Sequence, residues 1–184
     1  LSQADLQQVV ADLDSLERIT GQFLLFAGGG DQEAALAVPL EQLLAEQAAG
    51  LAASELELDL EPLVRLVQPV ALARAVANLI ANARSYGAPP LCLQLRAAEP
   101  AGEGFRIVIW DCGSGIPPER WDQALMPFQR LDVARGGSGH CGLGLAIAAR
   151  VARSHGGYLE RLEADGNSAW RFGIALQGRS QGQS

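Results

Sequence analysis

An apolar run at residues 105–110 stops at Asp111, and a turn with Gly113, Gly115 and two prolines follows at once. Such a run, in which Arg106 is the one polar residue, predicts a buried strand. Glycine allows close approach of the backbone to a ligand, and proline keeps the strand from continuing. We therefore treat Asp111 as a candidate site residue, although an ordinary polar turn has the same local pattern.

The strand at 105–110 has a predicted partner in residues 91–96, joined to it by the turn-forming residues 99–104. A second pair is predicted around Asp165-Gly166-Asn167, and a strictly alternating segment predicts a fifth strand. These three further strands are residues 158–163, 170–176 and 55–60.

Helical periodicity predicts three helices within the domain and a long helix before it. The domain helices begin near Pro39 and span residues 68–86 and 145–155, while residues 3–27 carry one long apolar stripe. We predict an α/β fold, a two-layer α/β sandwich with a mixed five-stranded sheet and three helices, preceded by the long N-terminal helix. Residues 119–144 are predicted to form a long functional loop, and residues 177–184 a disordered tail.

Composition excludes several functions. The net charge is -7, which disfavours a nucleic-acid surface. All 14 basic residues are arginines, so a P-loop, which needs a lysine, is absent. We expect neither a membrane span nor a leader peptide, because no sufficiently long apolar run occurs. The three cysteines indicate neither a disulfide framework nor a zinc site.

Two further features suggest a ligand. Asn78 and Asn82 lie four residues apart, on one face of the predicted helix. They fit a solvated face or buried hydrogen bonds, but amide oxygens also suit Mg²⁺. Gly142 and Gly144 precede another helix, where glycine is a common cap and where free backbone N–H groups can bind an anion.

Four segments follow one another along the chain: residues 78–83 with Tyr86, residues 111–116, residues 127–130 and residues 142–147. In this order they resemble the asparagine, first glycine, phenylalanine and second glycine boxes of sensor histidine kinases, in the GHKL (Bergerat-type) ATPase superfamily. Residues 16–27 also resemble the second helix of the dimerisation hairpin of that family. The resemblance implies a partial hairpin at 1–30, an ATP-binding catalytic domain at 31–176 and the tail at 177–184.

The resemblance implies ATP and Mg²⁺ as ligands. Asp111 would accept a hydrogen bond from the adenine amine, with Gly113 and Gly115 letting the base lie close. Asn82, backed by Asn78, would hold Mg²⁺. The implied nucleotide-binding residues are Asn78, Asn82, Arg84, Tyr86, Asp111, Gly113, Gly115, Ile116, Phe128, Arg130, Gly142, Leu143, Gly144 and Leu145. Among these, Tyr86 would pack near the base, Phe128 would anchor the lid, and Arg130 would reach the phosphates.

The chain departs from the family pattern at three places. Ser85 stands where relatives often carry a basic residue, with Arg84 one position earlier, and His140 replaces a lid glycine. The phosphoacceptor histidine is also missing: His140 lies in the lid, and His155 lies at a helix end, where positive charge is favoured. We therefore expect the acceptor histidine to lie outside these residues, in a longer parent protein.

The resemblance predicts a histidine protein kinase fragment that passes a phosphoryl group to that histidine and then to a response regulator. We expect a homodimeric parent anchored in the cytoplasmic membrane, with this part cytoplasmic and free of membrane and nucleic-acid contacts. One alternative is a degenerate, non-catalytic interaction module. A gyrase- or chaperone-type ATPase ranks last, because residues 68–86 contain no glutamate to activate water.

Overall fold

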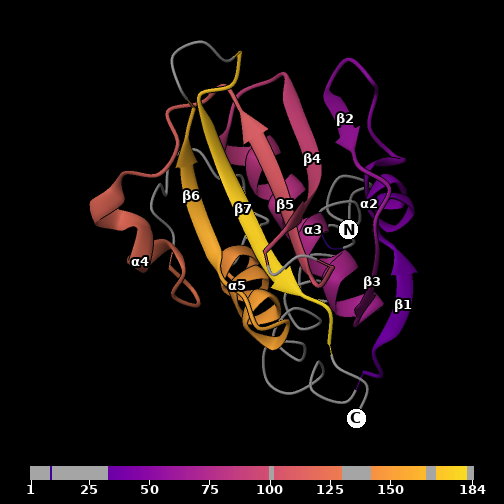
Figure 1. The fold of residues 1–184 in the computed structure, drawn as a ribbon. Helices are drawn as coiled ribbons and strands as arrows, with labels where there is room; N and C mark the ends of the chain where they lie inside the picture. The colour runs from indigo at the N-terminus through magenta and orange to yellow at the C-terminus, as the bar shows by residue number, and fades with distance from the viewer. Residues whose placement is uncertain (1–8, 10–32, 100–101, 130–141, 165–168, 182–184) are drawn as a thin grey trace.

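The computed structural model describes residues 9, 33–99, 102–129, 142–164 and 169–181 of the chain (Figure 1). Of the predicted N-terminal helix only Val9 lies within these ranges, where it is helical and exposed. The rest of the segment at 1–30 lies outside the described residues. Within the described ranges, no helix combines the length and the apolar character that crossing a bilayer requires.

One layer of the molecule is a five-stranded sheet with the strand order β2-β4-β5-β7-β6. β2 is parallel to β4, and every other neighbouring pair is antiparallel. The predicted mixed sheet is therefore confirmed, including both predicted antiparallel pairs. The strands are β2 (Leu56–Leu60), β4 (Leu91–Ala98), β5 (Gly104–Asp111), β6 (Leu159–Glu163) and β7 (Phe172–Arg179).

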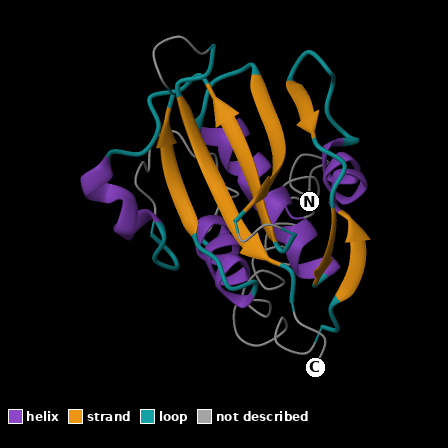
Figure 2. Ribbon diagram, in the orientation of Figure 1, coloured by secondary structure: helices purple, strands orange, loops and turns teal. Residues whose placement is uncertain are grey.

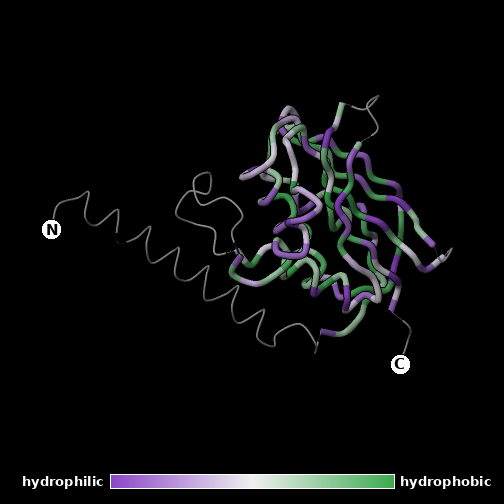
Figure 3. The backbone as a smooth tube through the Cα atoms, turned by 90° about the vertical axis from the view of Figure 1, so that its left-hand side faces the viewer, coloured by the Kyte–Doolittle hydropathy of each residue, from purple (hydrophilic) through white to green (hydrophobic). Residues whose placement is uncertain are grey.

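The other layer is formed by α2 (Leu40–Ala48), α3 (Pro69–Tyr86) and α5 (Gly144–Ser154), which lie on one side of the sheet (Figure 2). From the side, the helices and the strands form two adjacent layers (Figure 3). α3 begins with Pro69, where the missing N–H costs no helical hydrogen bond. The buried residues of α3 recur in pairs every four positions, whereas α5 is buried along most of its length. Both helices pack against alternate residues of β4, β5 and β7.

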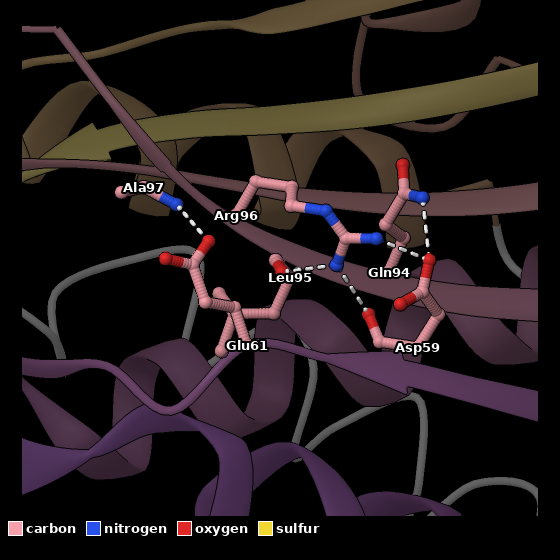
Figure 4. Close-up of polar contacts among 6 residues, drawn as sticks. All are labelled: Asp59, Glu61, Gln94, Leu95, Arg96 and Ala97. Carbon is pink, nitrogen blue, oxygen red and sulfur yellow. Dashed lines mark hydrogen bonds and ion pairs between the residues drawn. The ribbon is translucent and has the colours of Figure 1, made fainter.

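The opposite face of the sheet is polar at its β2 edge (Figure 4). Asp59 in β2 accepts hydrogen bonds from Gln94, at 2.8 Å, and from Arg96, with which it also forms an ion pair. These two hydrogen bonds keep the pKa of the Asp59 carboxyl below its usual value. Glu61 accepts a hydrogen bond from the Ala97 N–H at 3.1 Å. The side chains thus tie the edge strand β2 to β4.

A second, two-stranded sheet was not predicted. β1 (Leu36–Pro39) pairs antiparallel with β3 (Val64–Val67) next to α2. Each strand has only four residues, too few for a periodic pattern to emerge.

The predicted tail at 177–184 is wrong for residues 177–181. β7 continues to Arg179, and the N–H of Ser180 donates to the Glu103 carbonyl at 2.8 Å. The N–H of Gln181 donates to the Leu66 carbonyl at 2.7 Å. Gly178 lies under the ring of Phe105, which occupies the space of a side chain. The polar composition of this segment therefore did not indicate that it forms the end of a strand paired with the buried strand β5. Residues 182–184 lie outside the described ranges.

The predicted loop at 119–144 begins with short helical turns, η1 (Pro118–Arg120) and α4 (Trp121–Ala124). Trp121 and Leu125 pack against the core, and Ala124 is buried. Seven residues show no clear helical repeat, which explains why these turns were missed. Residues 130–141 lie outside the described ranges.

The sequence predicted His155 as a residue at a helix end, where a positive charge is favourable, but the structure shows a different role. The side chain is 1% exposed, and its Nε2 accepts the N–H of Gln68 at 3.1 Å. Nδ1 lies 2.8 Å from the Val151 carbonyl, to which it donates. Burial lowers the pKa of this imidazole, against smaller opposing effects of the Val151 carbonyl and the Glu33 carboxylate. His155 is therefore a neutral side chain that joins the end of α5 to the start of α3.

Candidate nucleotide-binding site

Asp111 is the last residue of β5 and is only 5% exposed. Its Oδ1 accepts the N–H of Gly113 at 2.6 Å and the N–H of Ala88 at 3.4 Å. Burial raises the pKa of the Asp111 carboxyl, and these two N–H groups offset part of that rise. Two backbone N–H groups thus hold the Asp111 carboxylate in place, and its burial makes the charged form less favourable than it would be in water.

Two glycines bring the end of α3 against this turn. The N–H of Cys112 donates to the Ala88 carbonyl at 2.9 Å. A Cβ atom at Gly87 would lie 2.6 Å from Asp111 Cγ, and one at Gly113 would lie 3.1 Å from Gly87 Cα. Any larger side chain at either position would push the two backbones apart. Gly87 was not among the predicted site residues, because its contact with Asp111 is a long-range one.

The far end of the turn rests on β6 and β7. Gly115 has φ +67°, and a Cβ atom there would lie 2.2 Å from the Phe172 ring. Ile116 packs against the core, and its carbonyl accepts the Nε–H of Arg161 at 3.1 Å. Phe172 and Arg161 were not predicted as site residues. Both appear in the sequence as ordinary strand positions, and no local signal distinguishes them.

The two asparagines lie on α3, where both are half-buried. A Cβ atom at Gly144 would lie 3.6 Å from Asn78 Oδ1, so the first turn of α5 is next to the asparagine-bearing face of α3. The structure therefore brings together two segments 66 positions apart (144 minus 78). Arg84 is exposed in the last turn of α3, and Tyr86 is half-buried at its end.

The second glycine segment enters α5 through Gly142, which has φ +71°. The Gly142 carbonyl accepts the N–H of Phe128 at 3.0 Å. The described residues that flank the predicted lid, on its two sides in the sequence, therefore meet at this hydrogen bond. Leu143 and Leu145 are buried in the core, which fixes the start of the helix. Phe128 itself has φ +63° and a side chain that is 56% exposed. Arg130 and His140 lie outside the described residues.

Most of the predicted site residues that the structure describes therefore form two groups, both of which involve α3. The asparagines and the start of α5 make one, and the turn 111–116 with the end of α3 makes the other. α3 belongs to both, because it carries Asn78 in its middle and leads to Gly87 at its end. This arrangement offers a buried acceptor at one end and amide oxygens beside a helix N-terminus at the other.

Comparison with known proteins shows the family to which the chain is related. The family described as "Histidine kinase-, DNA gyrase B-, and HSP90-like ATPase" matches residues 67–178. A probable sensor histidine kinase of Mycobacterium tuberculosis is 32% identical over 161 residues, covering 84% of this chain and 42% of the relative. The histidine-protein kinase/phosphatase MprB of Mycolicibacterium smegmatis is 41% identical over 88 residues, covering 48% of this chain and 18% of that protein.

Solved structures show the same fold. The mycobacterial sensor histidine kinase MprB aligns with a TM-score of 0.60 and 27% identity, over 80% of this chain and 99% of that one. Full-length ShkA in complex with AMPPNP aligns with a TM-score of 0.75 and 21% identity, over 100% of this chain and 41% of that one. The chain spans less than half the length of the curated relatives given above. It belongs to the histidine kinase-, DNA gyrase B- and HSP90-like ATPase family, as a catalytic domain of the sensor histidine kinase type.

Proposed function

We propose that this domain binds Mg-ATP between α3, the turn 111–116 and the start of α5, and donates its γ-phosphoryl group to a histidine outside the chain. The observation that carries the proposal is the buried Asp111 carboxylate, held through Oδ1 by two backbone N–H groups. Oδ2 is then the oxygen that accepts the exocyclic amine of adenine. A buried acceptor is selective because a base without that amine leaves it unsatisfied.

The glycines support a flat ligand at this end. Side chains at Gly87 or Gly113 would fill space beside the carboxylate, and one at Gly115 would strike Phe172. In the proposed complex, the base lies along Gly113, Gly115 and Ile116, with Tyr86 close to it.

The phosphates are proposed to lie between the asparagines and α5. Amide oxygens of Asn82 and Asn78 fit Mg²⁺, because this ion prefers hard oxygen ligands and completes its shell with water and phosphate. When bound, Mg²⁺ neutralises charge on the phosphates. The backbone N–H groups at Gly142 and Gly144 face the same ligand, and Leu143 and Leu145 hold them in place by their burial. Arg84 and Arg130 are the proposed arginine contacts, and Phe128 the anchor of the lid.

The rest of the proposed reaction belongs to the parent protein. The acceptor histidine is proposed to lie on a dimerisation hairpin, of which residues 1–30 supply part, in a homodimer anchored at the membrane. The phosphoryl group then passes to a response regulator. The support is that several relatives are named as sensor histidine kinases and that they extend well beyond this chain.

Isothermal titration tests the nucleotide site. The wild-type domain should bind Mg-ATP, and Asp111→Asn should weaken binding by about tenfold or more, as expected for loss of one charge-assisted hydrogen bond. Ser114→Asn is a matched control, because Ser114 is an exposed neighbour in the same turn. Equal affinities of wild type and Asp111→Asn would rule out the assignment of Asp111.

Phosphotransfer tests the enzymatic part. The domain, mixed with the separate acceptor hairpin of its parent and radiolabelled ATP, should transfer label to that hairpin. The Asn82→Ala variant should lose transfer. Tight ATP binding without any transfer of label to the hairpin would contradict the proposed kinase activity and would favour the non-catalytic module.

A further inference from the structure

The turn 111–116 is fixed from three directions. Towards α3, Cys112 bonds to the Ala88 carbonyl, and towards β7 the N–H of Arg171 donates to the Asp111 carbonyl at 2.9 Å. The end of the turn at Ile116 has a third contact, the 3.1 Å hydrogen bond from Arg161 Nε in β6. This contact joins backbone and side chain across 45 residues. Of these three hydrogen bonds, the first two join backbone to backbone, and the one from Arg161 depends on the identity of a side chain.

Arg161 is itself held in one orientation. Its Nη2 forms an ion pair and hydrogen bond with Glu163, two residues along the same strand. The Arg161 side chain is 20% exposed, whereas that of Glu163 is 68% exposed. The guanidinium is therefore engaged at two atoms, with Nε at the Ile116 carbonyl and Nη2 at the more exposed Glu163 carboxylate. An arginine fork fixed on one side in this way loses little further freedom when it donates on the other.

The hydrogen bonds of the described residues include no other to the backbone of Ile116. Pro117 follows it and carries no N–H, so the backbone cannot be tied there by its own donor. The side chain of Ile116 packs against the core, but its backbone position along the proposed base depends on the carbonyl. A freed carbonyl would let this wall of the pocket move without unfolding the sheet.

We propose that Arg161 is a positioning residue that sets the nucleobase end of the pocket by fixing the Ile116 backbone. The inference rests on the proposed nucleotide site. It assigns Arg161 no contact with phosphate, because its guanidinium is engaged by Ile116 and Glu163 at the opposite end of the turn from Asp111. Arg161 thus affects binding of the base and not binding of the phosphates.

Two substitutions separate the Nε donor from everything else that the arginine supplies. In Arg161→Gln the amide Nε2 stands at the chain position of the arginine Nε, so it can donate to the Ile116 carbonyl. In Arg161→Met a methyl carbon stands at the same position and cannot donate. Both variants lose the charge and the ion pair with Glu163, and both side chains have similar length. The pair therefore differs mainly in one hydrogen bond.

Isothermal titration of wild type, Arg161→Gln and Arg161→Met with Mg-ATP is the test. Arg161→Met should bind about 5- to 30-fold more weakly than wild type, and Arg161→Gln within about threefold of it. The Kd of Mg-tripolyphosphate, which has no base, should be equal for the two variants in the same titration. If Arg161→Met does not fold, Arg161→Leu replaces it, because its side chain likewise carries no charge and no hydrogen-bond donor.

Equal Mg-ATP affinities of the Gln and Met (or Leu) variants, with wild-type binding intact, would overturn this inference alone. An equal loss of ATP and tripolyphosphate binding would also overturn it, since it would make Arg161 a residue of general stability. Absence of Mg-ATP binding by the wild type would overturn the proposed function and this inference with it.

Discussion

At the scale of single residues, the proposed site carries a cost in stability. Asp111 is buried with a raised pKa, so its ionised form is less favourable in the folded chain than in the unfolded chain. Such a cost is typical of a group kept for its chemistry rather than for packing. The glycines around it are a second sign, because they give up side-chain packing to make room.

The first prediction concerns Asp111→Asn. Asparagine keeps an acceptor for Gly113 and Ala88 but carries no charge, so the variant should unfold at a higher temperature than wild type at pH 7. A raised folded pKa means that the wild-type cost is complete above the folded pKa and absent below the unfolded pKa of about 3.9. The difference in Tm between the two proteins should therefore shrink as the pH falls towards 4. A variant less stable than wild type at pH 7 would contradict this account of the carboxylate.

The second prediction concerns Gly87→Ala. The new Cβ would meet the Ala83 carbonyl oxygen at 2.5 Å and Asp111 Cγ at 2.6 Å, so we expect overpacking worth about 1–3 kcal/mol and a marked loss of ATP binding. Gly50→Ala is the control, since nothing lies within 4 Å of its Cβ position. Urea unfolding and ATP titration of both variants measure the effects. Unchanged ATP affinity in Gly87→Ala would show that the contact with Asp111 is unimportant.

At the scale of elements, α3 links the two ends of the site, and its own start is tied down by the preceding segment. The carboxylate of Glu33 accepts the N–H groups of Val70 and Ala71 at 2.6 and 2.9 Å. The Glu33 carbonyl accepts Gln68 Nε2 at 3.0 Å. An acidic side chain on the first free N–H groups of a helix stabilises both those groups and the helix dipole.

The third prediction follows from this cap. Glu33→Ala should lower the free energy of unfolding by about 0.5–2 kcal/mol, because two N–H groups of α3 lose their acceptor. Glu46→Ala, on the exposed side of α2, should change it by less than about 0.5 kcal/mol. Chemical denaturation of the two variants gives the comparison. Equal effects would mean that solvent replaces Glu33 without cost.

The sequence predicted the elements with strong periodicity and missed those held by long-range contacts. α3, α5 and the five strands of the main sheet were found from their apolar spacing. β1 and β3 are too short to show a periodic apolar spacing. The end of β7 is polar, although it pairs with β5 as far as Gly104. In the site, Asp111 and the asparagines carry local signals, whereas Gly87, Phe172 and Arg161 act through contacts that only the folded chain creates.

At the scale of the whole molecule, the helical layer and the sheet meet at His155. This side chain bonds to α3 and α5 and lies edge-on to the ring of Phe105 in β5, with ring centres 6.1 Å apart. Its backbone carbonyl accepts the N–H of Arg179 in β7 at 2.7 Å. A charge on this imidazole would therefore disturb the main core.

The fourth prediction is a loss of stability in mild acid. Because burial lowers the folded-state pKa of His155, the unfolded chain binds a proton first as the pH falls below about 6.5. The stability that depends on neutral His155 is therefore complete above about pH 6.5 and is lost as the pH falls from there towards the folded-state pKa of His155. Urea unfolding from pH 8 to 5 should show this decline, and His155→Gln should flatten it. A histidine NMR titration at or above pH 6.5 for His155 would contradict the account.

The central claim is that Asp111 selects adenine in a Mg-ATP site, and comparing ATP with inosine triphosphate tests it most directly. Inosine carries a carbonyl oxygen in place of the adenine amine, so it faces the Asp111 carboxylate with an acceptor instead of a donor. Isothermal titration should show wild-type preference for Mg-ATP by about tenfold or more, and Asp111→Asn should remove or reverse that preference. Equal wild-type affinity for the two nucleotides, or the same preference in Asp111→Asn, would contradict the claim.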